Sequence, residues 1–313
     1  MLSRVAESLY WTARYMERAE DLARLVNVHS NLIMDLPRSV ELGWEPLIAI
    51  TGSEAPFAKL FGDEMDERNV TRFIIADRRN PGSILSALFM ARENLRSTRD
   101  LVPREGWEQV NDLYLHARQE LKGGIAKRKR YDFLRGVIQR CQQLTGLLAG
   151  TMSHDEAYEF IRIGRNLERA DMGTRILDVR SEDLLPHRAE DLTPFENIQW
   201  MSVLKSLTAY QMYRRNVRVR VRGSDVLRYL LQDPKLPRAL LHCMSEVEAC
   251  LHDLPRNDGP LRSVTRMKRR IQEANVPELA ESGLHEFLDD LQVELSRLHA
   301  EIANTYFLLD RAA

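Results

Sequence analysis

The stretch RYMERAEDLAR, residues 14–24, has a counterpart in RNLERADMGTR, residues 165–175. Both contain a Glu-Arg pair, an Arg three positions before the Glu, an acidic residue three positions after it and an Arg seven positions after it. On a helix, apolar residues flank the charges of the first stretch on both sides, which is typical of a helix buried around most of its circumference. The pattern therefore predicts charged helices inside a bundle.

The likeness between the two halves extends past this motif. The Glu-Arg pairs are 151 residues apart, whereas RFIIADRRNPGSIL (72–85) matches RYLLQDPKLPRALL (228–241) at a spacing of 156. Trp44 and Trp200 are also 156 residues apart, so an insertion of five residues near SEDLLPHRAED (181–191) would account for the change. Ordered matches at two consistent spacings indicate an internal tandem duplication.

Helix signals dominate the rest of the chain. Residues 3–36 form one long helical pattern, Asn80 before Pro81 is predicted to cap a helix, and Ser153 begins a capping-box sequence ahead of another. Only NVRVRVRG (216–223) alternates like a strand, and one such run cannot form a sheet alone.

We therefore expect an all-α, multi-helix bundle. Its two halves, residues 1–150 and 151–313, would be related by a pseudo-twofold axis and fused in one globular unit.

The composition excludes several classes of protein. The 313 residues include 45 basic and 46 acidic side chains, a balance that argues against a nucleic-acid binder. No run approaches the roughly 20 apolar residues of a membrane span, and the N-terminus is too charged for a signal peptide. Three cysteines without zinc spacing suit a reducing compartment, so we expect a cytoplasmic protein.

The charges of the repeated motif need partners if they are buried. With halves packed about a pseudo-twofold axis, Glu17 and Arg18 would face Arg169 and Glu168 reciprocally. One interpretation is a buried charge network that holds the halves in register. Another is a polar cavity whose guanidinium groups receive a carboxylate or phosphate; a third is simple surface exposure. The guanidinium groups in question belong to Arg14, Arg18, Arg165 and Arg169.

Three features together resemble the bacterial alpha-E domain family: the two Glu-Arg motifs, the opening LSRVAESLYWTARYMERAEDLARLV (2–26), and NPGSILSALFMARENLRSTRDLVPREGWEQVNDLY (80–114). By genomic association, the resemblance implies partnership with circularly permuted ATP-grasp ligases and transglutaminase-like peptidases. It implies a system that makes or trims a peptide or amide-linked metabolite. It supplies this context and no mechanism.

The ARENLR part of that segment has two interpretations. Its arginines form either a solvated helix face or further ligands of the same polar centre as Glu17 and Glu168. The full set of candidates for a ligand site or buried charge network is Arg14, Glu17, Arg18, Glu20, Arg24, Arg92, Glu93, Asn94, Arg96, Arg165, Glu168, Arg169, Asp171 and Arg175.

No metal or cofactor is predicted. None of the eight His residues has a Glu three positions before it, as a di-metal carboxylate bundle would need. HExxH, P-loop and GxSxG motifs are absent. The basic runs KRKR (127–130) and 214–222 are candidates for a solvated surface or for contact with an acidic partner.

Two functions remain open from the sequence. The first is a non-catalytic helical partner or scaffold for an ATP-grasp-type ligase, with or without binding of the ligase substrate; a transglutaminase-like peptidase is a second possible partner. The alternative is an enzyme that uses Glu17 or Glu168, with neighbouring arginines, as acid or base. The oligomeric state is open.

Overall fold

The computed structural model describes residues 1–36, 42–122, 126–182, 196–217 and 221–308. These residues contain fifteen α-helices, a short 3-10 helix at Arg99–Leu101 and no strand, which confirms the all-α prediction. Residues 218–220, in the middle of the alternating run, and most of the expected insertion near 181–191 lie outside the described part. None of the described helices combines the length and apolarity that a membrane crossing requires.

Each half contributes one long central helix and a set of flanking helices. The first half contains α1 (Ser3–Asp35), α2 (Glu45–Thr51), α3 (Glu54–Phe61), α4 (Glu67–Ile75), α5 (Ile84–Ser97), α6 (Arg104–Glu120) and α7 (Lys127–Thr151). The second contains α8 (Glu156–Glu182), α9 (Glu196–Ser206), α10 (Tyr210–Asn216), α11 (Gly223–Gln232), α12 (Leu240–His252), α13 (Asp258–Glu273), α14 (Val276–Glu281) and α15 (Leu284–Tyr306).

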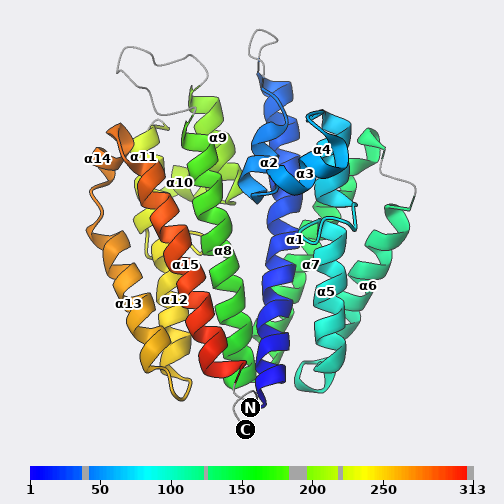
Figure 1. Cartoon of the computed structure of the whole chain (residues 1–313), viewed down its shortest axis with the longest axis vertical. Coiled ribbons are helices and arrows are strands. Elements are labelled where there is room, and N and C mark those ends of the chain that lie inside the picture. Colours follow the sequence, from blue (N-terminus) through cyan, green and yellow to red (C-terminus); the bar gives the residue numbers. More distant parts are fainter. Residues whose placement is uncertain (37–41, 123–125, 183–195, 218–220, 309–313) are drawn as a thin grey trace.

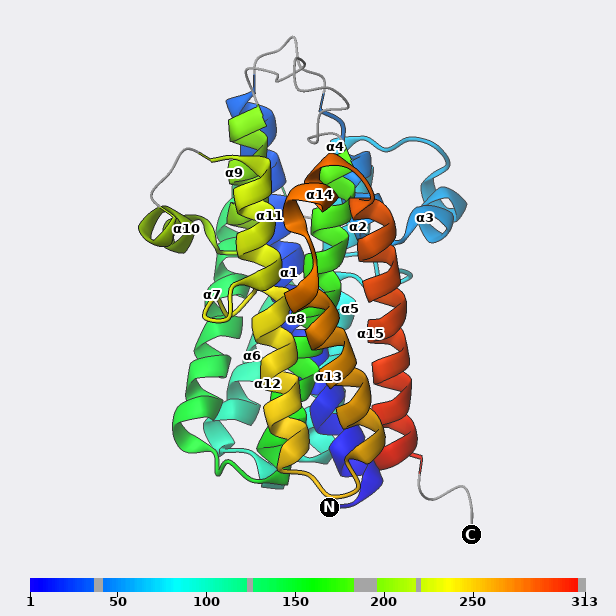
Figure 2. The same cartoon turned by 90° about the vertical axis from the view of Figure 1, so that its left-hand side faces the viewer.

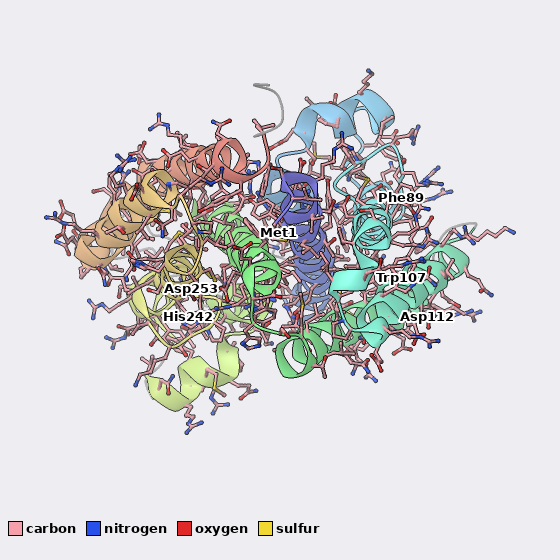
Figure 3. All side chains as sticks on the ribbon, turned by 90° about the horizontal axis from the view of Figure 1, so that it is seen from below. Met1, Phe89, Trp107, Asp112, His242 and Asp253 are labelled. Carbon is pink, nitrogen blue, oxygen red and sulfur yellow. The ribbon has the colours of Figure 1, made fainter. Side chains whose placement is uncertain are left out.

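The central helices α1 and α8 stand side by side in the middle of the bundle (Figure 1). They run in the same direction, because the amino group of Met1 pairs with Glu156 at the start of α8, 3.1 Å away. Helices α5 and α7 flank α1, and α12 and α15 flank α8. In the view along the bundle, Met1 lies near the middle, with Phe89 of α5 on one side and His242 of α12 on the other (Figure 3).

The short helices gather toward the end of the bundle away from Met1 (Figure 2). There the two halves exchange contacts, because α2 of the first half packs on α8 and α9 of the second packs on α1. Helices α10, α11 and α12 each begin 156 residues after α3, α4 and α5. Each half therefore builds the same succession of helices, with α14 as an addition to the second.

Two expected helix starts are wrong. Helix α5 does not begin at Pro81, because Ser83 is its cap and accepts a hydrogen bond from the backbone N–H of Ser86 at 3.2 Å. The Asn80 side chain instead shapes the preceding loop by accepting from the N–H of Gly82 at 2.9 Å.

The start of α8 differs in the same way. Asp155, and not Ser153, caps this helix, and its carboxylate accepts from the backbone N–H groups of Ala157 and Tyr158 at 3.0 and 3.4 Å. A carboxylate at this position also interacts favourably with the positive end of the helix dipole.

The two central helices approach each other closely at Gly164 of α8. A Cβ atom there would collide with the backbone oxygen of Tyr10 and would lie 3.3 Å from the Cβ of Ala13. Because backbone atoms of a buried helix cannot move aside cheaply, only glycine allows this crossing.

Replacing Gly164 with Ala should therefore lower the free energy of unfolding, by about 1–3 kcal/mol, as overpacking of a core does. Urea denaturation measures this. Gly146→Ala on α7 is the matched control, because nothing lies within 4 Å of a Cβ at that position. It should raise stability by up to about 1 kcal/mol through helix propensity. Equal effects of the two changes would contradict the tight crossing.

Candidate functional site

A band of charged side chains crosses the interface between α1 and α8, and ion pairs link its members across the two halves. We call it the central charge network. Its members are Arg14, Glu17, Arg18, Glu20, Asp21, Arg24, Glu168, Arg169 and Arg238.

Glu168 of α8 is held by two guanidinium groups of α1. Nε of Arg14 lies 2.6 Å from one carboxylate oxygen, and Nε of Arg18 lies 2.5 Å from the other. Only 1% of the Glu168 side chain is exposed. Burial by itself raises the pKa of Glu168, but the two positive charges outweigh it and hold the pKa below its ordinary value.

Glu17 of α1 is held in the reciprocal way. Nε of Arg169 on α8 donates to Glu17 at 2.8 Å, and Arg238 approaches the same oxygen to 2.7 Å. Burial raises the pKa of Glu17, but Arg169 and Arg238 outweigh it and lower the pKa to about 2. Both motif carboxylates are therefore ionised at neutral pH.

Arg238 comes from the loop before α12 and is buried among three carboxylates of α1. Besides Glu17, it donates to Glu20 at 3.0 Å and to Asp21 at 2.5 Å. The second oxygen of Asp21, Oδ2, has no hydrogen-bond partner among the described residues. Burial, together with the charges of Glu17 and Glu20, raises the pKa of Asp21 to about 7 although Arg238 opposes the rise.

This geometry does not suit acid–base chemistry by the motif glutamates. A general acid must hold a proton near the working pH, and an effective base needs a pKa close to it. Glu17 and Glu168 meet neither condition. Beside Glu17 there is a space of only about 30 Å³, enough for one water molecule.

Other candidates join or border the network. Arg24 pairs with Glu20, and Nε of Arg175 donates to Asp171 at 3.2 Å. Arg165 lines the small space beside Glu17. Burial and the neighbouring charge of Arg169 lower the pKa of Arg165.

The ARENLR residues do not join it. Nε of Arg92 donates to Asn111 of α6 at 2.8 Å, and its guanidinium lies 5.8 Å from the ring centre of Trp107. Glu93 pairs with Arg96 at 3.0 Å, and the backbone oxygen of Asn94 accepts from hydroxyls of the same segment. These side chains belong to the α5–α6 side of the bundle, where Trp107 lies in Figure 3.

Metal binding receives no support from the described residues, which contain no group of three or more His, Cys, Asp or Glu side chains placed to hold an ion.

Sequence reasoning missed Arg238, the residue with the most ion pairs in the network. A signal was present in the repeat, because the spacing of 156 that aligns Pro81 with Pro237 places Arg238 opposite Gly82. In this alignment Arg238 corresponds to Gly82, directly after the matched prolines, so the two halves differ in charge at this position.

A family model for Alpha-E, described as a predicted alpha-helical domain with a conserved ER motif, matches residues 1–307. The uncharacterized proteins Mb2597 of Mycobacterium bovis and Rv2567 of Mycobacterium tuberculosis are each 25% identical to this chain over 325 aligned positions. The match covers 96% of this chain but 35% of each relative, so the chain spans about a third of their length. No solved structure matches it.

Replacing Glu168 with Gln should destabilise the fold, because it leaves Arg14 and Arg18 buried without a countercharge. Breaking a buried pair in this way costs about 3–5 kcal/mol, which urea denaturation would detect. Glu108→Gln is the control, because its pair with Arg104 is on the surface and its loss should leave stability unchanged. A Glu168→Gln protein as stable as the parent would show that the network is not structural.

The contribution of Asp21 to the free energy of unfolding should fall as pH rises from about 4 to 7, because Asp21 keeps a proton in the folded state that the unfolded chain releases near its ordinary pKa of 3.8. One such proton contributes up to about 1.4 kcal/mol per pH unit. Asp21→Asn removes this contribution, so the difference in free energy of unfolding between parent and variant should change across the window. The control is Asp112→Asn, on the surface, which should show the same dependence of unfolding free energy on pH as the parent. The same dependence in Asp21→Asn would contradict a raised pKa of Asp21.

Proposed function

This chain belongs to the Alpha-E family, and we propose that it is a non-catalytic helical partner of an ATP-grasp-type ligase in a system that forms peptide or amide bonds. The observation that carries the proposal is the state of the two Glu-Arg pairs. Glu17 and Glu168 are buried, ionised and bound by guanidinium groups of the opposite half. The motif thus ties the two halves together, and neither motif glutamate is free to act as an acid or a base.

The length of the mycobacterial relatives supports a role in which this domain works together with other protein domains or chains. In the mycobacterial proteins the matching region is only 35% of the chain, so it is covalently joined to a larger amount of other sequence. A domain that is fused to others in one organism commonly works beside separate chains in another. We choose the ATP-grasp-type ligase as the first partner, and the transglutaminase-like peptidase as the second, because the sequence resemblance implies a genomic association with both.

Tandem duplication of a half-length ancestor accounts best for the architecture. Three observations support it: the common order of helices, the shared spacing of 156 residues, and the reciprocal packing of α2 on α8 and α9 on α1. Such an origin explains why the Glu-Arg motif occurs once in each central helix.

A basic groove between α4 and α7 is the surface on which we place the partner. Its volume is about 1,040 Å³, and its charged lining has six cations against two carboxylates. Such a surface favours an acidic segment of another protein over a neutral one. The cations are Arg68, Arg72, Arg78, Arg79, Lys127 and Arg130, and the carboxylates are Glu67 and Asp77.

The test is co-expression with an ATP-grasp-type ligase and a transglutaminase-like protein from the genome that encodes this chain. We expect a complex with the ligase that survives gel filtration at low salt and dissociates as salt rises. Reversing two groove charges, Arg68→Glu with Arg72→Glu, should abolish it. The matched control is Arg214→Glu with Arg215→Glu on α10, a second exposed basic pair.

Retention of the complex in the groove variant, or its loss in the α10 variant, would place the interface elsewhere. If no complex forms and ligation is unchanged without this chain, the proposed function is wrong.

A further inference from the structure

A second cavity, of about 190 Å³, lies between α1, α2, α4 and α8, at the other end of the network from Arg238. Arg18 and Glu168 of the network form one wall. Asp171 and Arg175, one and two turns further along α8, form another. The loop before α5 closes it with Asn80 and Gly82.

This cavity occupies the position that Arg238 fills in the second half. Arg238 immediately precedes Ala239, the N-cap of α12, and its side chain reaches the carboxylates of α1. Gly82 immediately precedes Ser83, the N-cap of α5, and faces the equivalent stretch of α8 across the cavity. One half therefore has a guanidinium at this position and the other half has space.

The charges around the two positions also differ. Glu17, Glu20 and Asp21 surround Arg238, whereas the residues 151 positions later are Glu168, Asp171 and Met172. One carboxylate is thus replaced by a thioether, and Glu168 is already held by Arg14 and Arg18. The cavity has no need of a further cation. Arg18 and Arg175 line the cavity together with Glu168 and Asp171, and Arg14 pairs with Glu168 from outside the lining. When Arg14 is counted with the two lining arginines, three guanidinium groups stand against two carboxylates.

Hydrogen-bonding groups at the cavity wall remain available. Within the described residues, no acceptor takes a hydrogen bond from Nη1 of Arg18 or from either Nη of Arg175, and no donor reaches Oδ2 of Asp171. Nη1 of Arg175 lies beside Gly52, where a Cβ would come within 3.1 Å of it. The side chains of Arg18 and Arg175 are 25% and 33% exposed, so a small solute can reach them.

We infer that this cavity binds a free amino acid, with its carboxylate on Arg18 and Arg175 and its ammonium on Asp171. Guanidinium groups bind a carboxylate through paired N–H donors, and a carboxylate accepts readily from an ammonium. The volume equals that of about six water molecules, which suits a molecule of this size. The surplus positive charge favours an acidic amino acid, aspartate or glutamate. The site belongs to the isolated chain and does not depend on the proposed ligase.

The test is calorimetric titration of the purified chain with L-aspartate, L-glutamate and their analogues without the amino group, succinate and glutarate. We expect an acidic amino acid to bind at least tenfold more tightly than its analogue. Gly82→Arg should abolish binding by filling the cavity as Arg238 fills its counterpart. A Cβ fits there with a small shift of Asn80, whose Oδ1 would be 3.2 Å away. Gly146→Arg, on the exposed face of α7, should bind as the parent does.

Two further variants protect the test against misfolding. Gly82→Arg with Met172→Asp reproduces the Arg238–Asp21 pair, and it should be folded and unable to bind. Arg175→Ala should weaken binding at least tenfold with an unchanged circular dichroism spectrum. The inference is overturned if neither amino acid binds, if succinate or glutarate binds as tightly, or if folded Gly82→Arg variants keep the parent affinity. Since the ligase complex is measured separately, failure here leaves the proposed function untouched.

Discussion

Two carboxylates, those of Glu17 and Glu168, lie in helices that are surrounded by protein, and each must find positive charge there. Removing a carboxylate from water costs several kcal/mol unless close, well-oriented partners replace the solvent. Arginines of the same helix supply part of that charge in solvent-exposed helices, but here the decisive partners come from the opposite half. The network therefore constrains how the two halves pack, in rotation and in register, more narrowly than the apolar contacts around it can.

The same constraint explains the tight crossing of the central helices. Short arginine–carboxylate distances require α1 and α8 to approach closely, and Gly164 against Ala13 permits that approach. The flanking helices then cover both sides of the pair and exclude water, which strengthens the ion pairs in turn. Small residues at the crossing and charged residues beyond it are thus parts of one arrangement.

In the central charge network, each motif glutamate binds arginines of the opposite half, but the surroundings of the two glutamates differ. The side chain of Arg238 fills the space beside Glu17, whereas Gly82, at the matching position in the other half, leaves a cavity beside Glu168. Under the proposed duplication, such a difference would let one half serve stability while the other half binds a ligand. The basic groove between α4 and α7 and the cavity at Gly82 have no lining residue in common, so the proposed partner and the proposed ligand would occupy separate sites.

The sequence alone was sufficient for the all-α class, the long central helices and the residues of the Glu-Arg motif, because these depend on periodicity and on the cost of unpaired buried charge. It misplaced the caps of α5 and α8, because several polar residues near each start compete for the same N–H groups. It left Arg92 open between a solvated helix face and the polar centre of the motif, and tertiary packing turns that side chain toward Asn111. The role of Arg238 and the cavity at Gly82 were decided only by the tertiary structure. Both depend on which loops reach the central helices, a matter of three-dimensional packing between segments far apart in the chain: Arg238 lies 218 residues from Glu20, and Gly82 lies 86 residues from Glu168.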